Sequence, residues 1–447
     1  MKKIISALLL SVPLFMGSCS DDPEISVSQT EFHNVECGET ALSVNIKTSG
    51  VWTATSLNKW LVPSAVKGEN DAELIINVSD NVAEERTGKV VVRGVDGTLI
   101  NIHVNQQGYP IDQEYTYELP VIFHVLYKSR SDRKQFVDYS RIVKILENVN
   151  KLYDGVTVHA GGDQSVNMNL QFVLAKTDEE GNPLQLPGVE YIKWDEMPID
   201  CEQFMGSRDQ KNLDILWDHN RYINVVLYNF AATGGNGTIL GISHMPYTIA
   251  GPNALPGLGT SPNNYISKEN LSYPHCVSIN TLFAYEDKGT GDQPNSGDIT
   301  VTVAHELGHY LGLHHAFDEA PNGGLSTDCI DSDFCKDTPS YNRNAYMQEL
   351  LFMMQQAAQM GTYVPYSKGA VRIDCNTAEE FMSYNIMDYE ITYADRFTAD
   401  QRKRIRNVLT YSPLMPGPKK GAAGTRTIVH GKLDLPVKTV KCYLTNP

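Results

Sequence analysis

The chain has 447 residues, which is too long for one hydrophobic core and suggests two or three domains. Its composition, 41% apolar and 20% charged, is that of a folded protein rather than a disordered one. The formal net charge of -16 argues against nucleic acid as a partner, because phosphate binding draws on clustered Lys and Arg that would have to overcome this field.

The first residues have the composition of an export signal. Two lysines precede an apolar run over residues 4–16, which is too short to cross a bilayer, and small residues then lead to Cys19. Residues 1–18 are therefore expected to be a signal peptide. The stretch "MGSC" resembles a bacterial lipobox, which implies that Cys19 carries a lipid anchor; an ordinary signal peptide with an incidental cysteine is the alternative.

Residues 19–24 form an acidic stretch directly after the predicted cleavage site. The sequence "SDDPE" is similar to the acidic export signal of surface lipoproteins in Bacteroidetes-type bacteria, although a solvated linker explains it almost as well. The resemblance implies an outer-membrane lipoprotein exposed at the cell surface. Because the mature chain remains strongly acidic, only the lipid is expected to hold it to the membrane.

Cysteine usage supports an exported protein. Of the eight cysteines, seven remain after Cys19, so at least one stays unpaired if the others form disulfides. No C-x-x-C occurs, which argues against a zinc ribbon or a thioredoxin-like site.

Residues 25–108 contain short alternating runs separated by Gly, Asn and Asp turns, the pattern of a small all-β sandwich. The stretch "GVWTATSLNKWLVPSAVKG", with Trp52 and Trp60, resembles the BACON domain of Bacteroidetes surface proteins. The resemblance implies a possible glycan contact, but two Trp in so small a sandwich are also explained by packing, which would make the domain a spacer. Residues 109–115 are expected to be a linker.

Residues 116–415 are expected to form an α/β domain with a mixed sheet and helices. Apolar residues recur at spacings of three and four from Ile142 to Leu152, which predicts a helix over 139–155. Runs typical of strands lie at 118–127, 168–175, 222–229, 238–248 and 275–283.

Two further helices are predicted nearer the C-terminus. One covers 345–360, and the other covers 397–409 with Thr398 as its N-cap. Residues 416–447 are basic, carry no recognisable signal, and are treated as a tail outside the domain.

The stretch "TVAHELGHYLGLHHAF", residues 302–317, gathers four of the twelve histidines of the chain. The β-branched residues before it favour a strand locally, but the chemistry requires a helix. His305 and His309 are four residues apart, which on a helix presents both imidazoles on one face to a zinc ion. Glu306 points aside and can reach water at the metal rather than the metal itself.

The spacing of the third histidine completes a metal-binding pattern. Gly312 allows the chain to leave the helix through a positive-φ turn, and His315 can then return as a third ligand. The spacing is H-E-x-x-H-x-x-G-x-x-H, which is typical of metzincin zinc proteases. His314 is a rival third ligand whose spacing is one short. The remaining candidates are interpreted as ordinary strand histidines: His124, His244 and His275.

A metzincin also needs a tight turn with a methionine beneath the metal, and "SYNIMDYE" supplies it at Met387. Met387 would form an apolar floor that fixes the imidazoles. Tyr389 is placed to direct its hydroxyl at the zinc and to stabilise an oxyanion; a packed aromatic is the alternative.

The motifs "HELGHYLGLHHAF", "CKDTPSYN", "NIMDY" and "FTADQ" together resemble the pappalysin or cytophagalysin family of metzincins. The resemblance implies that Glu306 is the general base, that Tyr389 stabilises the transition state, and that zinc is the cofactor. It also implies a disulfide between Cys329 and Cys375 and a structural calcium near Asp337 and Thr338. The implied zinc ligands are His305, His309 and His315. The sequence departs from simpler members in a helical insertion over 342–370.

These features predict a secreted, lipid-anchored zinc endopeptidase that acts on a polypeptide substrate. An extended substrate is expected to pair with a rim strand at 237–247. The alternative is a surface glycan- or protein-binding lipoprotein with a degenerate metzincin scaffold.

The cleavage preference is left open by the sequence. Relatives in this family often cut before a basic residue, and Glu390 or Asp395 could select one, but Arg396 could neutralise Asp395. A modest preference for Arg or Lys therefore stands against a broad or apolar preference.

Overall fold

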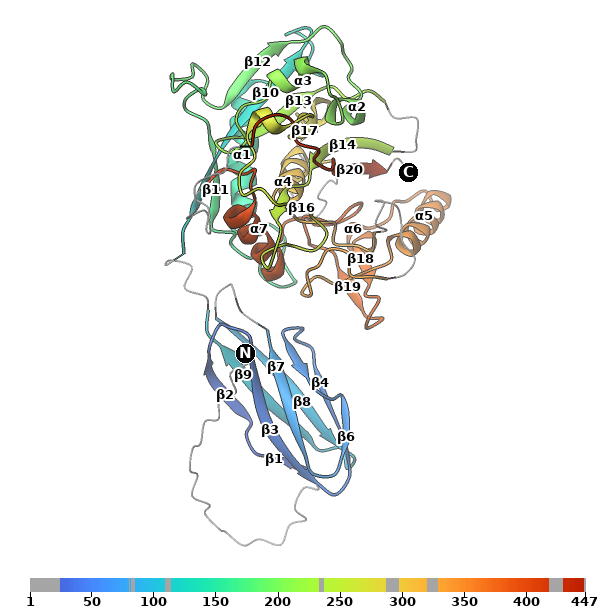
Figure 1. Ribbon diagram of the computed structural model, residues 1–447. Helices are drawn as coiled ribbons and strands as arrows, with labels where there is room; N and C mark the ends of the chain where they lie inside the picture. The colour runs from blue at the N-terminus through green and yellow to red at the C-terminus, as the bar shows by residue number, and fades with distance from the viewer. Residues whose placement is uncertain are drawn as a thin grey trace. The chain divides into compact units, whose positions relative to one another are not determined.

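The computed structural model divides the chain into two compact units, Met1–Glu114 and Tyr115–Pro447 (Figure 1). The predicted signal peptide, Cys19 and most of the predicted linker lie outside the described residues. No helix in the described part of the chain is long and apolar enough to cross a membrane. The described residues are 25–79, 81, 85–108, 114–232, 237–286, 297–319, 329–417 and 429–445.

The first unit is a sandwich of two sheets, as the alternating pattern predicted. One sheet has the strand order β1-β3-β7-β5 and the other β2-β9-β8-β4-β6. Alternate residues of β7, such as Leu74 and Ile76, are fully buried between the sheets. The strands are β1 (Ile25–Val27), β2 (Glu31–Val35), β3 (Thr40–Thr48), β4 (Val51–Ser56), β5 (Leu61–Pro63), β6 (Lys67–Glu69), β7 (Ala72–Val78), β8 (Arg86–Gly94) and β9 (Leu99–Gln106).

The two tryptophans of this unit have packing roles. Trp52 lies in the core at 2% exposure, and Gly68 faces its ring so closely that a Cβ there would be 2.1 Å from it. Trp60 is half-buried, with the guanidinium of Arg86 4.3 Å from its ring centroid. Trp52 is therefore inaccessible to a glycan, and one face of Trp60 is already covered.

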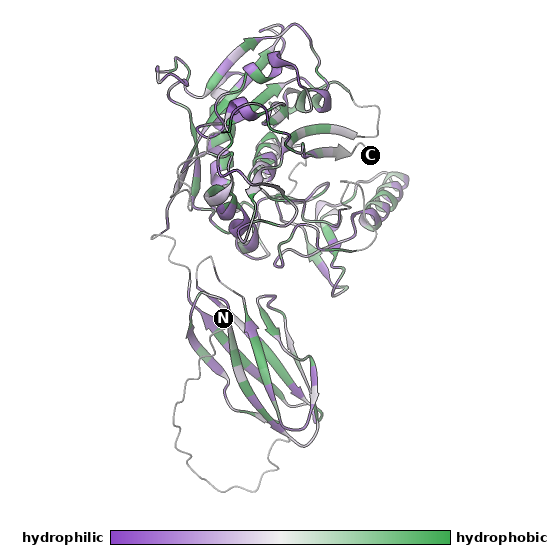
Figure 2. Ribbon diagram, in the orientation of Figure 1, coloured by the Kyte–Doolittle hydropathy of each residue, from purple (hydrophilic) through white to green (hydrophobic). Residues whose placement is uncertain are grey.

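The second unit is built on a seven-stranded mixed sheet, as expected for an α/β domain. The strand order is β11-β10-β13-β17-β14-β20, with β12 also paired to β10. The pairs from β11 to β17 are parallel, whereas β14 runs antiparallel to both of its neighbours. Figure 2 shows hydrophobic residues concentrated in these strands. The strands are β10 (Tyr117–Tyr127), β11 (Leu170–Leu174), β12 (Val189–Lys193), β13 (Ile223–Tyr228), β14 (Gly237–His244), β17 (Val277–Asn280) and β20 (Thr439–Thr445).

Two helices pack together against this sheet. Helix α1 (Tyr139–Tyr153) buries the predicted apolar face from Ile142 to Leu152, and the hydroxyl of Tyr153 donates to the Ala304 carbonyl of α4 (Ile299–Tyr310) at 3.0 Å. Helix α7 (Ala399–Tyr411) begins at the predicted N-cap, where the Thr398 hydroxyl accepts from the Gln401 N–H. All three helices contribute to one hydrophobic core with the sheet.

The predicted C-terminal tail differs from the structure. Part of it, β20, pairs antiparallel with β14 along seven residue pairs, so the second unit extends past residue 415. For the same reason the predicted rim strand, 237–247, is not a free edge: β14 lies between β17 and β20. A local pattern cannot reveal this pairing, because the two strands lie about two hundred residues apart in the chain.

The predicted insertion over 342–370 is helical. Helix α5 (Arg343–Gln359) directs Tyr346 and Leu350 into a cluster that also contains Tyr389. The structure contains the Cys329–Cys375 disulfide, which links the two ends of this region. The remaining elements are α2 (Cys201–Met205), α3 (Gln210–Asp214), β15 (Tyr247–Ile249), β16 (Gly259–Ser261), η2 (Lys268–Asn270), η3 (Thr281–Phe283), α6 (Tyr366–Gly369), β18 (Val371–Ile373) and β19 (Glu380–Met382).

Candidate metal centre and catalytic cleft

The site is built on α4, which forms despite its β-branched first turns. The Asp298 carboxylate caps the helix by accepting from the N–H groups of Thr300 and Val301. The helix ends at Gly312, whose φ of +96° turns the chain back. The Leu313 N–H then donates to the Gly308 carbonyl at 2.9 Å. Capping and burial override the local strand preference.

Three imidazoles converge at this end of the helix. Nε2 of His309 lies 3.0 Å from Nε2 of His305 and 3.1 Å from Nε2 of His315. All three rings are buried, at 2% exposure or less. His305 and His309 come from one face of α4, and His315 comes from the segment after the Gly312 turn.

The other ring nitrogens fix the tautomers. Nδ1 of His305 donates to the Ile386 carbonyl at 2.7 Å, and Nδ1 of His309 donates to the Leu313 carbonyl at 2.8 Å. Nδ1 of His315 lies 3.2 Å from both carboxylate oxygens of Glu319. Because a carbonyl only accepts, the protons of His305 and His309 sit on Nδ1, and their Nε2 atoms face the centre as bare lone pairs. Such an arrangement suits a bound cation, and imidazole nitrogens are common zinc ligands.

The electrostatics of these histidines also suit a metal. Burial lowers the pKa of His305 to about 4 and lowers the pKa values of His309 and His315 well below their usual range. The rings are therefore neutral at physiological pH, as ligands must be. Burial also raises the pKa of Glu319 to about 7, against the opposing effect of Arg343.

The turn beneath the histidines carries Met387, which is fully buried. A Cβ on Gly308 would lie 2.6 Å from the Met387 sulfur, so the helix and the turn are in close contact. The Ala316 N–H donates to the Met387 carbonyl at 3.0 Å, and the preceding Ile386 carbonyl holds His305. The turn therefore holds the chain on both sides of the Gly312 bend, at His305 and at Ala316, the neighbour of His315.

Glu306 is buried beside the three histidines. Its carboxylate oxygens have no hydrogen-bond partner among the described residues. Burial raises the pKa of Glu306 well above its usual value, and the nearby Cys442 backbone N–H lowers it. Gly241 of β14 leaves the space this side chain fills, because a Cβ there would be 2.5 Å from Glu306 Cγ.

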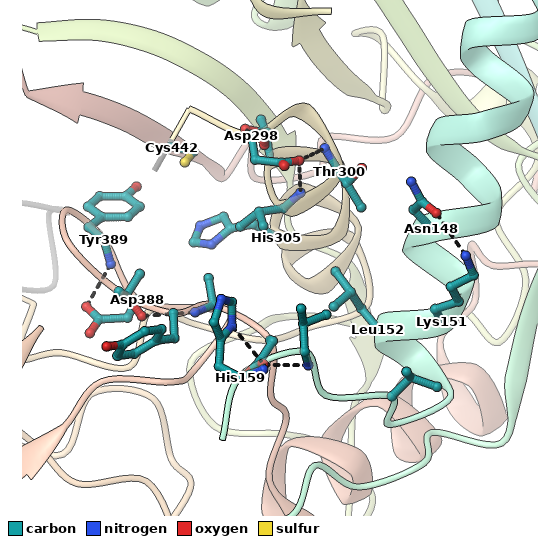
Figure 3. A pocket seen from close by; sticks show the side chains of 18 of the residues that line it. Asn148, Lys151, Leu152, His159, Asp298, Thr300, His305, Asp388, Tyr389 and Cys442 are labelled. Atoms are coloured by element: carbon teal, nitrogen blue, oxygen red, sulfur yellow. Dashed lines mark hydrogen bonds and ion pairs between the residues drawn. The ribbon is translucent and has the colours of Figure 1, made fainter. Parts of the chain in front are cut away.

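Tyr389 lies on the other side of the imidazoles. Its ring stacks on His305 at 5.5 Å between centroids and contacts His315 at 4.4 Å. The hydroxyl is buried without a partner in the described structure and points toward Cys442 (Figure 3). Burial raises the pKa of Tyr389 well above 10, so the hydroxyl keeps its proton and can donate.

A cavity of about 430 Å³ opens beside His305 (Figure 3). It is bounded by α1, by the first turn of α4, and by the segment after Met387. Tyr389 and Cys442 line its inner end, so the cavity is continuous with the metal centre. A pocket of this size accommodates one large side chain of a bound peptide.

Two acidic groups of this cavity, Glu390 and Asp395, are paired with arginines. Glu390 lies 2.7 Å from the guanidinium of Arg343, and Asp395 lies 3.2 Å from that of Arg396. The Asp395 carboxylate also accepts the backbone N–H groups of Val158 and His159. The acids that the sequence offered for binding a basic residue are therefore engaged within the protein.

Some predicted residues lie away from the centre. His314 packs edge-on against Phe334 at 5.4 Å, and the metal-capable groups of the described residues do not include it. Thr338 donates to an Asp333 carboxylate at 2.6 Å, and Asp337 accepts the Asp400 N–H at 2.9 Å. The metal-capable groups of the described residues include neither of them, so the implied calcium site is not supported.

Two residues at the centre were not predicted from the sequence. Glu319 follows His315 by four residues, and this spacing was the available signal for it. Cys442 lies in the segment 416–447, which was expected to be a tail. The alternation in "TVKCYLT" was the available signal for a strand there.

Residues 206–410 match the family model described as "Pregnancy-associated plasma protein-A", a peptidase family. Among solved structures, the chain is similar to mature mirolysin from Tannerella forsythia in complex with a cleaved peptide, at 19% identity over 66% of this chain and 91% of that one, with a TM-score of 0.42. It is also similar to a promirolysin variant from the same organism, at 19% identity over 67% and 82% of the two chains, with a TM-score of 0.43. The family match includes the three histidines, Glu306 and Tyr389, and ends before β20.

Proposed function

From the match of residues 206–410 to a metalloprotease family of the pappalysin type, we propose that the protein is a zinc-dependent endopeptidase. The observation that carries the zinc assignment is the convergence of three buried imidazoles, with Nε2 of His309 3.0 Å and 3.1 Å from Nε2 of His305 and His315. His305, His309 and His315 would hold the ion. When bound, zinc supplies Lewis-acid activation of water and of the scissile carbonyl.

Glu306 is proposed to move the proton. A cation beside this carboxylate opposes the effect of burial, because a nearby positive charge favours the ionised form. Glu306 then accepts a proton from the attacking water and passes it to the departing amine. The carboxylate is buried beside the histidines and no side chain of the described residues hydrogen-bonds it, which supports this role.

Tyr389 is proposed to stabilise the developing charge. Its protonated hydroxyl is buried and unengaged, and its ring is held against two of the histidines. A donor fixed in advance at this position costs no reorganisation when the carbonyl oxygen becomes negative. The binding-protein alternative has no observation in its favour, because no catalytic group expected from the motif is missing.

Metal removal tests the proposed function. We expect one zinc per chain by elemental analysis, loss of casein digestion after dialysis against a strong chelator, and recovery when zinc is returned. Dialysis against buffer alone is the control. Digestion that persists in metal-free protein would contradict the proposal.

The cleavage preference is expected to be broad or apolar. Glu390 and Asp395 each face an arginine, so neither offers an unneutralised charge to a substrate cation. Mapping of cuts in a denatured protein should find Arg and Lys no more frequent directly after the cut than in the substrate overall. A clear enrichment of either at that position would contradict this expectation and favour the basic preference of relatives.

We further propose that the protein is anchored at the cell surface through lipid on Cys19. The lipobox-like "MGSC" and the acidic residues after it support this location. A Cys19→Ala variant should leave the membrane fraction and keep its peptidase activity, because the anchor and the cleft lie in separate segments. Wild-type protein that is soluble without detergent and carries no acyl chain by mass spectrometry would contradict it.

A further inference from the structure

Helix α1 places cations along one wall of the cavity beside His305. Lys144 and Lys151 both line the cavity, and their spacing of two helical turns puts them on the same face of α1. Figure 3 shows Asn148 and Lys151 on α1, on the far side of the cavity from Tyr389. At a rise of ~1.5 Å per residue, this wall is cationic over a length of roughly 10 Å.

Neither lysine is held by a strong interaction in the described part of the chain. Lys151 donates to the side-chain oxygen of Asn148 at 3.2 Å, a neutral group that leaves its charge uncompensated. Lys144 lies 3.5 Å from Glu147, and the two side chains are 54% and 57% exposed. Such an exposed ion pair contributes little, because water and salt screen it. A substrate carboxylate can therefore replace Glu147 at Lys144.

The lining of the cavity contains four acidic groups, and each of them already has a partner. Glu390 and Asp395 are paired with arginines. Asp388 lies 3.4 Å from the guanidinium of Arg372, and Asp298 caps α4. The charges of the lining that remain for a substrate are therefore positive, in a protein whose formal net charge is -16.

Apolar side chains form a second part of the lining. Leu152, Val301 and Tyr393 contribute to its walls. Val156 and Val158 also line the cavity, although they are 50% and 65% exposed. Apolar surface left open in this way can be buried by a bound peptide. The cavity therefore suits an apolar side chain, and the adjacent wall of α1 suits an acidic one.

The dimensions of α1 fit a short stretch of substrate. An extended peptide rises about 3.3 Å per residue, so the cationic wall runs alongside about three residues. Strand β14 is paired on both sides, by β17 and β20, and offers no free edge to this peptide. Recognition at the cavity therefore depends on side chains rather than on main-chain pairing with β14.

We propose that the cavity selects polypeptides in which an apolar residue directly after the cut is followed, within the next three residues, by an Asp or Glu that Lys144 and Lys151 bind. The inference rests on the proposed peptidase function. The apolar side chain enters the cavity beside His305, and the carboxylate takes the place of water and of Glu147 at the lysines. Charge complementarity of this kind discriminates between substrates more than it raises affinity overall.

Cleavage profiling of the full-length protein with a peptide library tests the selection. We expect Asp and Glu to be enriched about fivefold at the second to fourth residues after the cut, the upper value for one exposed ion pair. The enrichment should weaken in about 1 M salt, where the Debye length is only about 3 Å. It should disappear in Lys144→Gln/Lys151→Gln and persist in Lys144→Arg/Lys151→Arg, which keeps both charges.

The matched control is Lys128→Gln/Lys193→Gln, which removes two exposed lysines that do not line the cavity. This variant should keep the enrichment. A wild-type profile without the enrichment would overturn the proposal, as would its retention in Lys144→Gln/Lys151→Gln. Loss of the enrichment in the arginine variant or in the control would overturn it as well.

Peptide binding separates this inference from the proposed function. Two fluorescent peptides that differ only in Glu or Gln two residues after a leucine are titrated into full-length Glu306→Ala protein, which is expected not to cleave them. We expect the Glu peptide to bind about fivefold more tightly; equal binding would overturn the selection. Tighter binding of the Glu peptide, with a wild-type protein that cleaves no peptide, would keep the selection and overturn the peptidase function. Cleavage by the wild type without acidic enrichment would do the reverse.

Discussion

A Glu306→Ala variant is expected to keep its zinc and to lose peptidase activity by about 10²–10⁴-fold, the usual contribution of a positioned general acid and base. The change removes the carboxylate without touching a histidine, so the metal centre stays assembled. Elemental analysis and initial rates of casein digestion measure the two effects on the same preparation.

The control for this variant is Glu349→Ala, the same change at an exposed position of α5. It should leave both the zinc content and the rate unchanged. Undiminished turnover in Glu306→Ala would remove this residue from the mechanism, whereas loss of zinc from it would make the residue a ligand or a structural support instead.

The second large effect is expected at the third histidine. In His315→Ala only two imidazoles remain, so zinc affinity should fall by more than about 100-fold, the upper range for loss of a supporting group around a metal. After dialysis the variant should retain little zinc and no peptidase activity. Zinc titration with a competing chelator measures the change in affinity.

The neighbouring histidine provides a matched control for this experiment. His314 packs edge-on against Phe334 and is not among the metal-capable groups of the described residues. His314→Ala should therefore bind zinc as the wild type does. A loss of zinc in His314→Ala with full retention in His315→Ala would reverse the ligand assignment.

Helix α4 shows what sequence reasoning could reach. Residues 299–303 favour a strand by propensity, yet the spacing of His305 and His309 has chemical meaning only on a helix, and the structure contains α4. The predicted sandwich, mixed sheet and flanking helices are also present, because their periodicity is local and strong. Helices and strands with local patterns of this kind can be predicted from the sequence without knowledge of any tertiary contact.

The closed edge of the sheet shows where such reasoning stops. The strand β14 was predicted, but its neighbour on the open side comes from a distant segment whose alternation is weak. The position of Cys442 beside Glu306 depends on its register opposite Gly241, and no spacing in the sequence encodes that register. Likewise, the pairing of Glu390 with Arg343 joins two segments that are separate in the sequence.

The Cys329–Cys375 disulfide makes the chain between its two ends, including α5, a closed loop spanning 46 residues. By the chain-entropy model, closing a loop of this length restricts the unfolded chain by about 4 kcal/mol. Because the closure cost grows only with the logarithm of length, doubling the loop would change it by about 0.6 kcal/mol. Insertions and deletions in exposed parts of the loop therefore change the closure entropy little, while the turn at Met387 lies beyond it. Tyr346 and Leu350 pack in the cluster with Tyr389 and are constrained, so the exposed face of α5 is where the sequence can diversify in evolution.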